Sequence, residues 1–135
     1  MSFNSKSIIS FHDCDPAGIL FYGRIFFFTH SAYEAMISSF NLSEDYWLNE
    51  DYVVPIIKSE AGYRIPFKYN DEIRIEIKVS KLKSSSFELS YECFNQKNEL
   101  CVEVKTVHVF VDKKLWKKKA MPGKLEENLR RFMIE

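Results

Sequence analysis

The 135-residue chain has no net charge, because nineteen lysines and arginines balance nineteen aspartates and glutamates. It therefore lacks the positive field that draws most nucleic-acid-binding domains to phosphate backbones, and we expect no nucleic-acid partner. Its three cysteines, Cys14, Cys93 and Cys101, are odd in number and far apart, with no C-x-x-C pair. This pattern argues against a disulfide framework and against a thiolate metal site, so we expect no bound metal.

Long apolar runs are also absent. The opening residues, MSFNSKSIIS, lack the apolar core of a signal peptide, and no run is long enough to span a bilayer. No repeat or Pro/Gly/Ser linker divides the chain, and a hydrophobic content of 46% is enough for a packed core. We therefore expect a cytoplasmic protein in which residues 1–135 form a single domain.

The sequence does contain a turn-forming segment in front of a long aromatic run, FHDCDPAGILFYGRIFFF at residues 11–28. A short strand at Ser7–His12 is expected to lead into this turn. A helix from about Tyr22 to Phe40 should follow, and because it is apolar around most of its circumference it should be buried. The segment LSEDYWLNE predicts a further short helix, with Ser43 as its N-cap.

The second half of the chain has the two-residue period of strands. Ile73, Ile75, Ile77 and Val79 alternate with polar residues, and FELSYECF repeats the alternation. In LCVEVKTVHVFV the apolar phase shifts near Lys105, which predicts either a bulge there or a central strand buried on both faces. Pro122 then opens an amphipathic C-terminal helix. These elements predict an α+β fold in which a curved antiparallel sheet of about five strands wraps a long central helix.

DCDPAGILFYGRIFFF (residues 13–28) resembles the corresponding segment of hotdog-fold acyl-CoA thioesterases of the 4-hydroxybenzoyl-CoA thioesterase type. The resemblance continues through VVPIIKSEAGYRIPFKYNDEIRIEI, KLKSSSFEL and VHVFVD, and THSAYEAM is similar to a stretch of 1,4-dihydroxy-2-naphthoyl-CoA thioesterases. It implies hydrolysis of an aromatic acyl-CoA to the free acid and coenzyme A. It also implies no cofactor beyond the coenzyme A of the substrate, and a homodimer or homotetramer with active sites at a subunit interface.

The resemblance makes Asp15 the catalytic carboxylate. The residues alone favour a turn residue or helix cap, since Asp before Pro is common in loops. A carboxylate near a helix N-terminus stays ionised, as nucleophilic attack or activation of water requires. The backbone N–H groups of Tyr22 and Gly23 are candidates for an oxyanion hole. Gly18 suits the tight backbone between Asp15 and these groups, and Asp13 is expected to be a hydrogen-bond acceptor that shapes the turn.

Further substrate-binding candidates lie outside this segment. His30 and Glu34 occupy a helical region where the family often has an acidic residue, so their role departs from the family pattern. Lys81, Lys83 and Ser85 precede a strand on the hairpin with which family members meet the phosphates of coenzyme A. Read from the residues alone, this hairpin is simply solvated. We expect two other histidines, His12 and His108, to be structural.

Other functions stay open. The substrate could be a short-chain aliphatic acyl-CoA, or the protein could be a non-catalytic acyl-CoA binding module. Hotdog hydratases carry a histidine five residues after the aspartate, where this chain has Leu20, so a hydratase is disfavoured. The lysine cluster at residues 113–119 is expected to be solvated, because without an amphipathic partner a charge run does not anchor a protein to a membrane.

Overall fold

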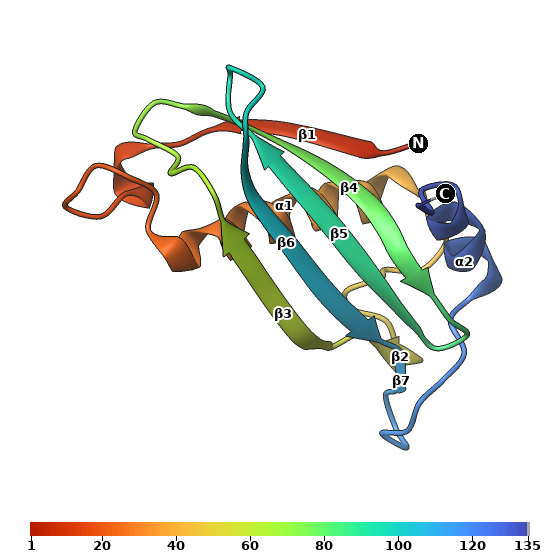
Figure 1. Cartoon of the computed structure of the whole chain (residues 1–135). Coiled ribbons are helices and arrows are strands. Elements are labelled where there is room, and N and C mark those ends of the chain that lie inside the picture. The colour runs from red at the N-terminus through yellow and green to blue at the C-terminus, as the bar shows by residue number, and fades with distance from the viewer. Residues whose placement is uncertain (135) are drawn as a thin grey trace.

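The computed structural model describes residues 1–134, in which one long helix lies against one face of a five-stranded antiparallel sheet (Figure 1). The strands of this sheet follow the order β1-β4-β5-β6-β3, so β1 and β3 are its edges. The elements in chain order are β1 (Phe3–Ile8), η1 (Phe11–Asp13), η2 (Tyr22–Arg24), α1 (Ile25–Ser39), β2 (Tyr52–Val53), β3 (Ile56–Tyr63), β4 (Glu72–Leu82), β5 (Ser86–Phe94), β6 (Leu100–Val109), β7 (Val111–Asp112) and α2 (Gly123–Arg130).

The alternation of β4 and β5 is as predicted. Every second residue faces the helix and is buried, and the residues between them face outward. The buried set of β5 consists of Phe87, Leu89, Tyr91 and Cys93. This stripe belongs to the same buried core as the inward residues of β4 and the apolar residues of α1.

The bulge or burial on both faces that was predicted near Lys105 is not found there. Lys105 faces outward in a regular alternation, in which Val104 and Thr106 on either side of it are buried. The irregularity lies further back, where the register between β5 and β6 shifts after Cys93. Thr106 and His108 occupy inward positions despite being polar, and this is why the apolar pattern looked displaced. The central position of β6, between β5 and β3, is confirmed.

The helix α1 is confirmed, but the prediction that it is enclosed on nearly all sides does not hold for a single chain. Its sheet-facing residues Phe28, Ala32 and Met36 are buried, whereas Phe27 is 53% exposed. Five strands cover only one face of the helix (Figure 1), so the apolar residues on its other side are left at the surface.

Two local predictions are corrected. The first strand is Phe3–Ile8 rather than Ser7–His12, because the chain turns into the 3-10 helix η1 at Phe11. The segment 43–51 contains no helix and runs as a series of bends. Its local organiser is Asp45, not Ser43: Oδ1 of Asp45 accepts the N–H of Trp47 at 2.9 Å. An aspartate that caps such a bend competes with helix formation.

The chain ends close to where it begins (Figure 1). Pro122 precedes α2 as predicted, and Leu125 and Leu129 of this helix are buried. Met133 continues past the helix to bridge Val79 of β4. Among the described residues, no helix is long and apolar enough to cross a membrane.

Candidate active site

The turn that carries Asp15 is fixed by its own hydrogen bonds. The N–H of Ala17 donates to Oδ1 of Asp15 at 2.9 Å, and the N–H of Gly18 donates to the Asp15 carbonyl oxygen, also at 2.9 Å. Gly18 has a φ of +77°, a backbone conformation that a glycine adopts without the strain of a side chain. One carboxylate oxygen of Asp15 is therefore held by the turn, while Oδ2 has no partner among residues 1–134.

Asp13 anchors this turn to the start of the helical segment, as its predicted role as a local acceptor required. Its side chain is 3% exposed, and Oδ2 accepts the N–H of Ser10 at 2.8 Å. Oδ1 accepts Nε of Arg24 at 2.8 Å, and the Asp13 carbonyl accepts the N–H of Phe21. The sequence did not indicate Arg24 as the partner.

A pocket of about 310 Å³ opens beside Asp15. Asp15 is the one carboxylate among the described residues that line it, and the guanidinium of Arg64 is the one strong cation. The remaining lining is mainly apolar and aromatic: Ile19, Leu20, Tyr22, Tyr63, Ile65, Pro66, Phe67 and Val102. A few polar groups in an apolar concavity are typical of a small-molecule site.

Tyr22 and Gly23 form the first turn of η2 at the edge of this pocket. Their N–H groups lie in a first helical turn, where no intrahelical acceptor exists, and no other group of residues 1–134 accepts a hydrogen bond from them. The hydroxyl of Tyr63 donates to the carbonyl oxygen of Tyr22, which ties the end of β3 to this turn. The structure therefore brings Asp15, Gly18, Tyr22 and Gly23 to one end of the molecule.

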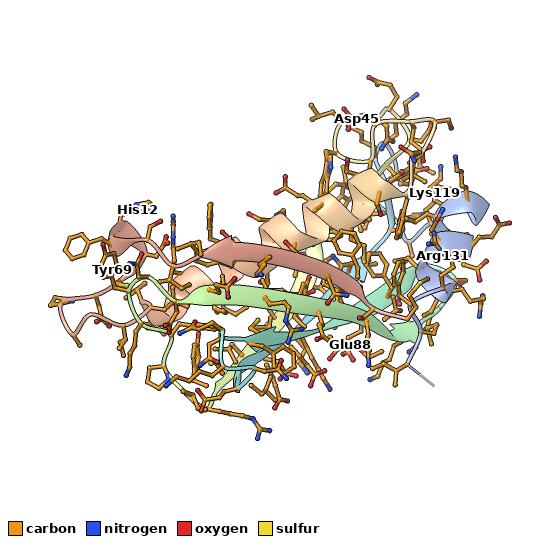
Figure 2. The ribbon with its side chains drawn as sticks, turned by 90° about the horizontal axis from the view of Figure 1, so that it is seen from above. His12, Asp45, Tyr69, Glu88, Lys119 and Arg131 are labelled. Atoms are coloured by element: carbon orange, nitrogen blue, oxygen red, sulfur yellow. The ribbon has the colours of Figure 1, made fainter. Side chains whose placement is uncertain are left out.

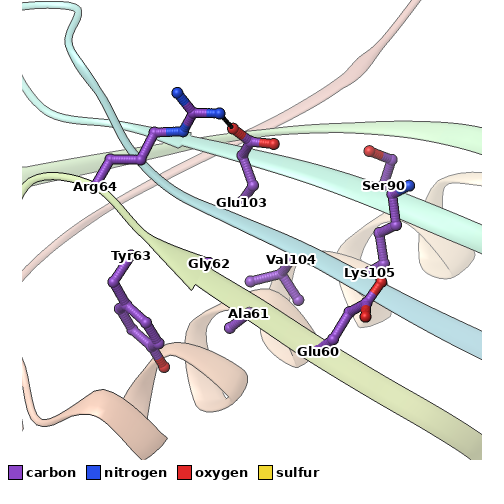
Figure 3. Close-up of a pocket in the computed structure, with 9 residues that line it drawn as sticks. All are labelled: Glu60, Ala61, Gly62, Tyr63, Arg64, Ser90, Glu103, Val104 and Lys105. Atoms are coloured by element: carbon purple, nitrogen blue, oxygen red, sulfur yellow. Dashed lines mark ion pairs between the residues drawn. The ribbon is translucent and has the colours of Figure 1, made fainter.

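The Asp15 pocket meets a second, charged groove at Tyr63 and Arg64, which line both. This groove has a volume of about 370 Å³ and runs over β3 and β6. Figure 3 shows Arg64 reaching to Glu103, with which it forms an ion pair at 2.5 Å, while the Tyr63 ring points toward the helical segment. The apolar pocket thus opens onto a polar surface.

His30 and Glu34 lie together on α1, two or more turns beyond Tyr22. Nδ1 of His30 is 2.8 Å from a carboxylate oxygen of Glu34, and both side chains are about half exposed. His30 also lines a smaller cavity of about 150 Å³ between α1 and the strands β3, β5 and β6. Neither residue lines the Asp15 pocket of the same chain.

Tyr91 and Thr106, which the sequence analysis did not single out, line that smaller cavity and connect to His108, which was expected to be structural. The hydroxyl of Tyr91 is 3.0 Å from the Thr106 hydroxyl, which is 2.7 Å from Nε2 of His108. His108 is fully buried and stacks on Phe87, and burial lowers the pKa of His108 to about 3, so the imidazole is neutral. The missed signal was the polar character of Thr106 and His108 at inward positions of β6.

Lys81, Lys83 and Ser85 lie at the β4–β5 hairpin, at the other end of the sheet from Asp15 (Figure 1). Eleven residues of β4 separate the two ends, a length of roughly 35 Å. Within one chain these residues therefore cannot meet a ligand held by Asp15 unless that ligand spans the sheet. Among the described residues, no three His, Cys, Asp or Glu side chains gather as metal ligands would.

Comparison with known proteins places this arrangement among enzymes that cleave thioesters. A family model described as the thioesterase-like superfamily matches residues 9–129. A 1,4-dihydroxy-2-naphthoyl-CoA hydrolase from Trichodesmium erythraeum is 27% identical over 137 residues, which covers 99% of this chain and 96% of the relative.

Solved structures share the fold. The 1,4-dihydroxy-2-naphthoyl-CoA thioesterase from Synechocystis superposes with a TM-score of 0.89 at 20% identity, covering 96% of each chain. A Staphylococcus aureus protein solved in complex with coenzyme A gives a TM-score of 0.90 at 10% identity, covering 98% of this chain and 84% of the other. The predicted hotdog architecture is confirmed by these likenesses.

Proposed function

This chain belongs to the thioesterase-like superfamily, and from that premise we propose that it hydrolyses an aromatic acyl-CoA to the free acid and coenzyme A beside Asp15. The observation that carries the proposal is the position of Asp15 on the wall of an apolar pocket, with one carboxylate oxygen fixed by the turn and the other unpartnered. The hydrolases and thioesterases of 1,4-dihydroxy-2-naphthoyl-CoA among the relatives support an aromatic acyl group, and a 4-hydroxybenzoyl group is the other aromatic candidate.

Two routes use the same carboxylate. In the first, Oδ2 of Asp15 attacks the thioester carbonyl carbon, the C–S bond breaks, the thiolate of coenzyme A leaves and takes a proton from solvent, and water hydrolyses the resulting mixed anhydride. In the second, Asp15 takes a proton from a water molecule as the water oxygen attacks the carbonyl carbon, and the C–S bond then breaks as the thiolate of coenzyme A leaves and takes a proton from solvent. Both develop negative charge on the carbonyl oxygen, and the unpaired N–H groups of Tyr22 and Gly23 are suited to stabilise it.

The two pockets together suit the two halves of an acyl-CoA. The apolar pocket can bury a flat acyl group, and the charged groove that joins it at Tyr63 and Arg64 offers polar partners to the pantetheine arm. A simple ester without the coenzyme would leave this groove unused.

A second copy of the chain would complete the site. The hairpin residues Lys81, Lys83 and Ser85 are far from Asp15 in one chain, so they can meet the phosphates of a coenzyme bound at Asp15 only from a partner subunit. His30 and Glu34 do not line the Asp15 pocket of their own chain, so we assign them to the acyl group that is bound in the partner's pocket. The exposed apolar residues Ile56 and Ile57 of β3, one of the two edge strands of the sheet, support a homodimer that forms along this strand.

The test is thiol release from a panel of aromatic and aliphatic acyl-CoAs by the wild type and by Asp15→Asn. The variant should keep the free energy of unfolding of the wild type and lose roughly a hundredfold or more of kcat/KM on the best substrate. Asp51→Asn replaces an exposed aspartate that lies outside the pocket and whose side chain forms no hydrogen bond among residues 1–134, so it is the control and should retain activity. Equal rates for the wild type and Asp15→Asn would refute the catalytic assignment, and tight binding without turnover across the panel would indicate a binding module.

A further inference from the structure

The loop that follows β7 presents two large apolar side chains to solvent. Leu115 is 69% exposed and Trp116 is 66% exposed, and the loop projects beyond the sheet at the end opposite η1 (Figure 1). Large apolar side chains at an exposed tip are a feature that soluble surfaces usually avoid unless they serve an interaction.

This tip is an ordered turn rather than a loose excursion. Oδ1 of Asp112 accepts the N–H groups of Lys114 at 3.0 Å and Leu115 at 2.9 Å, and the Asp112 carbonyl accepts the N–H of Trp116 at 2.8 Å. The N–H of Asp112 in turn donates to the carbonyl of Lys117 at 2.7 Å. Trp116 is held at a φ of +53°, a conformation that costs a non-glycine residue about 1 kcal/mol and persists only where the surroundings impose it.

The charge of the tip differs from that of the rest of the chain. Five of the nineteen lysines and arginines lie at residues 113–119, and Asp112 is the one carboxylate on the loop. Asp112 pairs with Lys119 at 3.6 Å, while Lys114, Lys117 and Lys118 form no ion pair among residues 1–134. Because the whole chain is neutral, the remainder carries a net negative charge, so an anionic surface would attract the tip and repel the rest.

A neighbouring loop adds to the apolar area. Trp47 is 43% exposed and Leu48 is 81% exposed, and Trp47 lines a surface cavity together with Trp116. Nζ of Lys113 donates to the carbonyl of Asn49 at 2.8 Å, which links the two loops. Figure 2 shows Asp45 and Lys119 toward one end of the molecule and His12 and Tyr69 at the other. The neighbouring loop also carries four carboxylates, Glu44, Asp45, Glu50 and Asp51. Glu44 accepts the hydroxyl of Tyr52, and Asp45 accepts the N–H groups of Trp47 and Leu48.

We infer that the tip formed by residues 113–119 docks the protein on an anionic lipid surface. Tryptophan prefers the boundary between lipid headgroups and acyl chains, leucine can enter the acyl region, and lysines at the headgroup level are attracted to anionic lipids. The expectation that this lysine cluster is merely solvated rested on the lack of an amphipathic partner, and the structure supplies that partner in Leu115 and Trp116. A second copy is a poor occupant, because its own five lysines would face these.

The experiment is sedimentation of the full chain with vesicles of phosphatidylcholine alone and of phosphatidylcholine mixed with phosphatidylglycerol. We expect binding to the mixed vesicles only, weakening as salt rises. Leu115→Ser/Trp116→Ser should abolish binding. Lys114→Gln/Lys117→Gln/Lys118→Gln should weaken it by roughly fivefold per lysine, or about a hundredfold in total. Both variants should keep the wild-type unfolding midpoint.

Matched controls come from the rest of the surface. Phe11→Ser removes an aromatic side chain that is 77% exposed at the opposite end, and Lys58→Gln/Lys68→Gln/Lys97→Gln removes three exposed lysines from other elements. Both should bind vesicles as the wild type does. Failure of the wild type to bind mixed vesicles, unchanged binding by Leu115→Ser/Trp116→Ser, or equal losses in the controls would overturn the inference. A raised KM for acyl-CoA in the lysine variant without vesicle binding would assign the lysines to the coenzyme and overturn it too.

Discussion

Nε of Arg24 donates to Oδ1 of Asp13 at 2.8 Å and thereby ties the last residue of η2 to the segment just before the Asp15 turn. Asp13 is buried and Arg24 is one-third exposed. Because water does not reach the carboxylate, the hydrogen bonds from Arg24 and from the N–H of Ser10 replace those that water would make. The pair fixes the turn that presents Asp15 relative to the N–H groups of Tyr22 and Gly23. The two aspartates, two residues apart, therefore have separable roles.

Replacement of Asp13 by Asn should reduce stability. The amide keeps one acceptor oxygen but loses the charge that compensates Arg24, and it places a donor where Asp13 only accepts. We expect a loss of about 2–4 kcal/mol in the free energy of unfolding, measured by urea denaturation. Asp15→Asn, at a partly exposed turn, is the comparison and should change stability by less than about 1 kcal/mol. Equal stability of the two variants would contradict the structural role of Asp13.

The buried hydroxyl chain makes a second prediction about stability. Thr106→Val removes the one group that bonds both Tyr91 and His108, so two buried polar side chains lose their partner, and we expect a cost of about 2–4 kcal/mol. Tyr91→Phe removes only the end of the chain and leaves the Thr106–His108 bond intact. Its cost should be about 1 kcal/mol. Similar costs for both variants in urea denaturation would show that Thr106 does not bridge the two.

The sequence was sufficient for the elements whose pattern is set by burial alone. Alternation at Ile73–Val79 and Phe87–Cys93 predicted two strands, and the aromatic run after the Asp15 turn predicted the long helix. It failed where polar side chains face inward. The Thr106 hydroxyl pairs with Nε2 of His108 inside the core, while Nδ1 of His108 has no partner among residues 1–134, so these two positions break the apolar period without breaking the strand.

The candidate site was only partly predictable for a different reason. Asp15, Gly18, Tyr22 and Gly23 lie within nine residues, so a local turn brings them together. Arg24, the partner of Asp13, follows Gly23 directly, but the pocket walls at Tyr63 and Phe67 come from elsewhere along the chain. Such contacts depend on the docking of β3 against the helical segment, and no short-range pattern in the sequence records that.

His108 should make stability depend on pH. Its pKa is lowered from 6.5 to about 3 because burial disfavours the imidazolium, so below pH 6.5 the unfolded chain binds a proton that the folded chain does not. Proton binding to His108 of the unfolded chain has no effect on stability above pH 6.5. As the pH falls from 6.5 toward 3, it lowers the free energy of unfolding progressively, by up to about 1.4 kcal/mol per pH unit.

The measurement for His108 compares urea unfolding of the wild type and of His108→Phe between pH 7.5 and 5. Phenylalanine keeps the stacking on Phe87 but cannot titrate. The variant should show a shallower fall in stability than the wild type across this range, where most carboxylates stay ionised. Parallel curves would mean that His108 can be protonated in the folded state.

The free edge at β3 predicts how the proposed dimer can be separated. Ile57 is 65% exposed on this edge strand, at the point where the register of β3 with β6 shifts. A lysine at this position would place a charge between β3 and any strand of a second chain that paired with it. Natural edge strands commonly carry such a lysine, which prevents association. Ile57→Lys should convert a dimer to a monomer in size-exclusion chromatography with light scattering, and activity should fall in parallel because the partner's hairpin and α1 residues are lost.

The control is Ile8→Lys, which alters a 48% exposed isoleucine on the opposite edge strand, β1, and should stay dimeric and active. A fully active Ile57→Lys monomer would show that one chain suffices and that Lys81, Lys83 and Ser85 do not act on a partner's substrate.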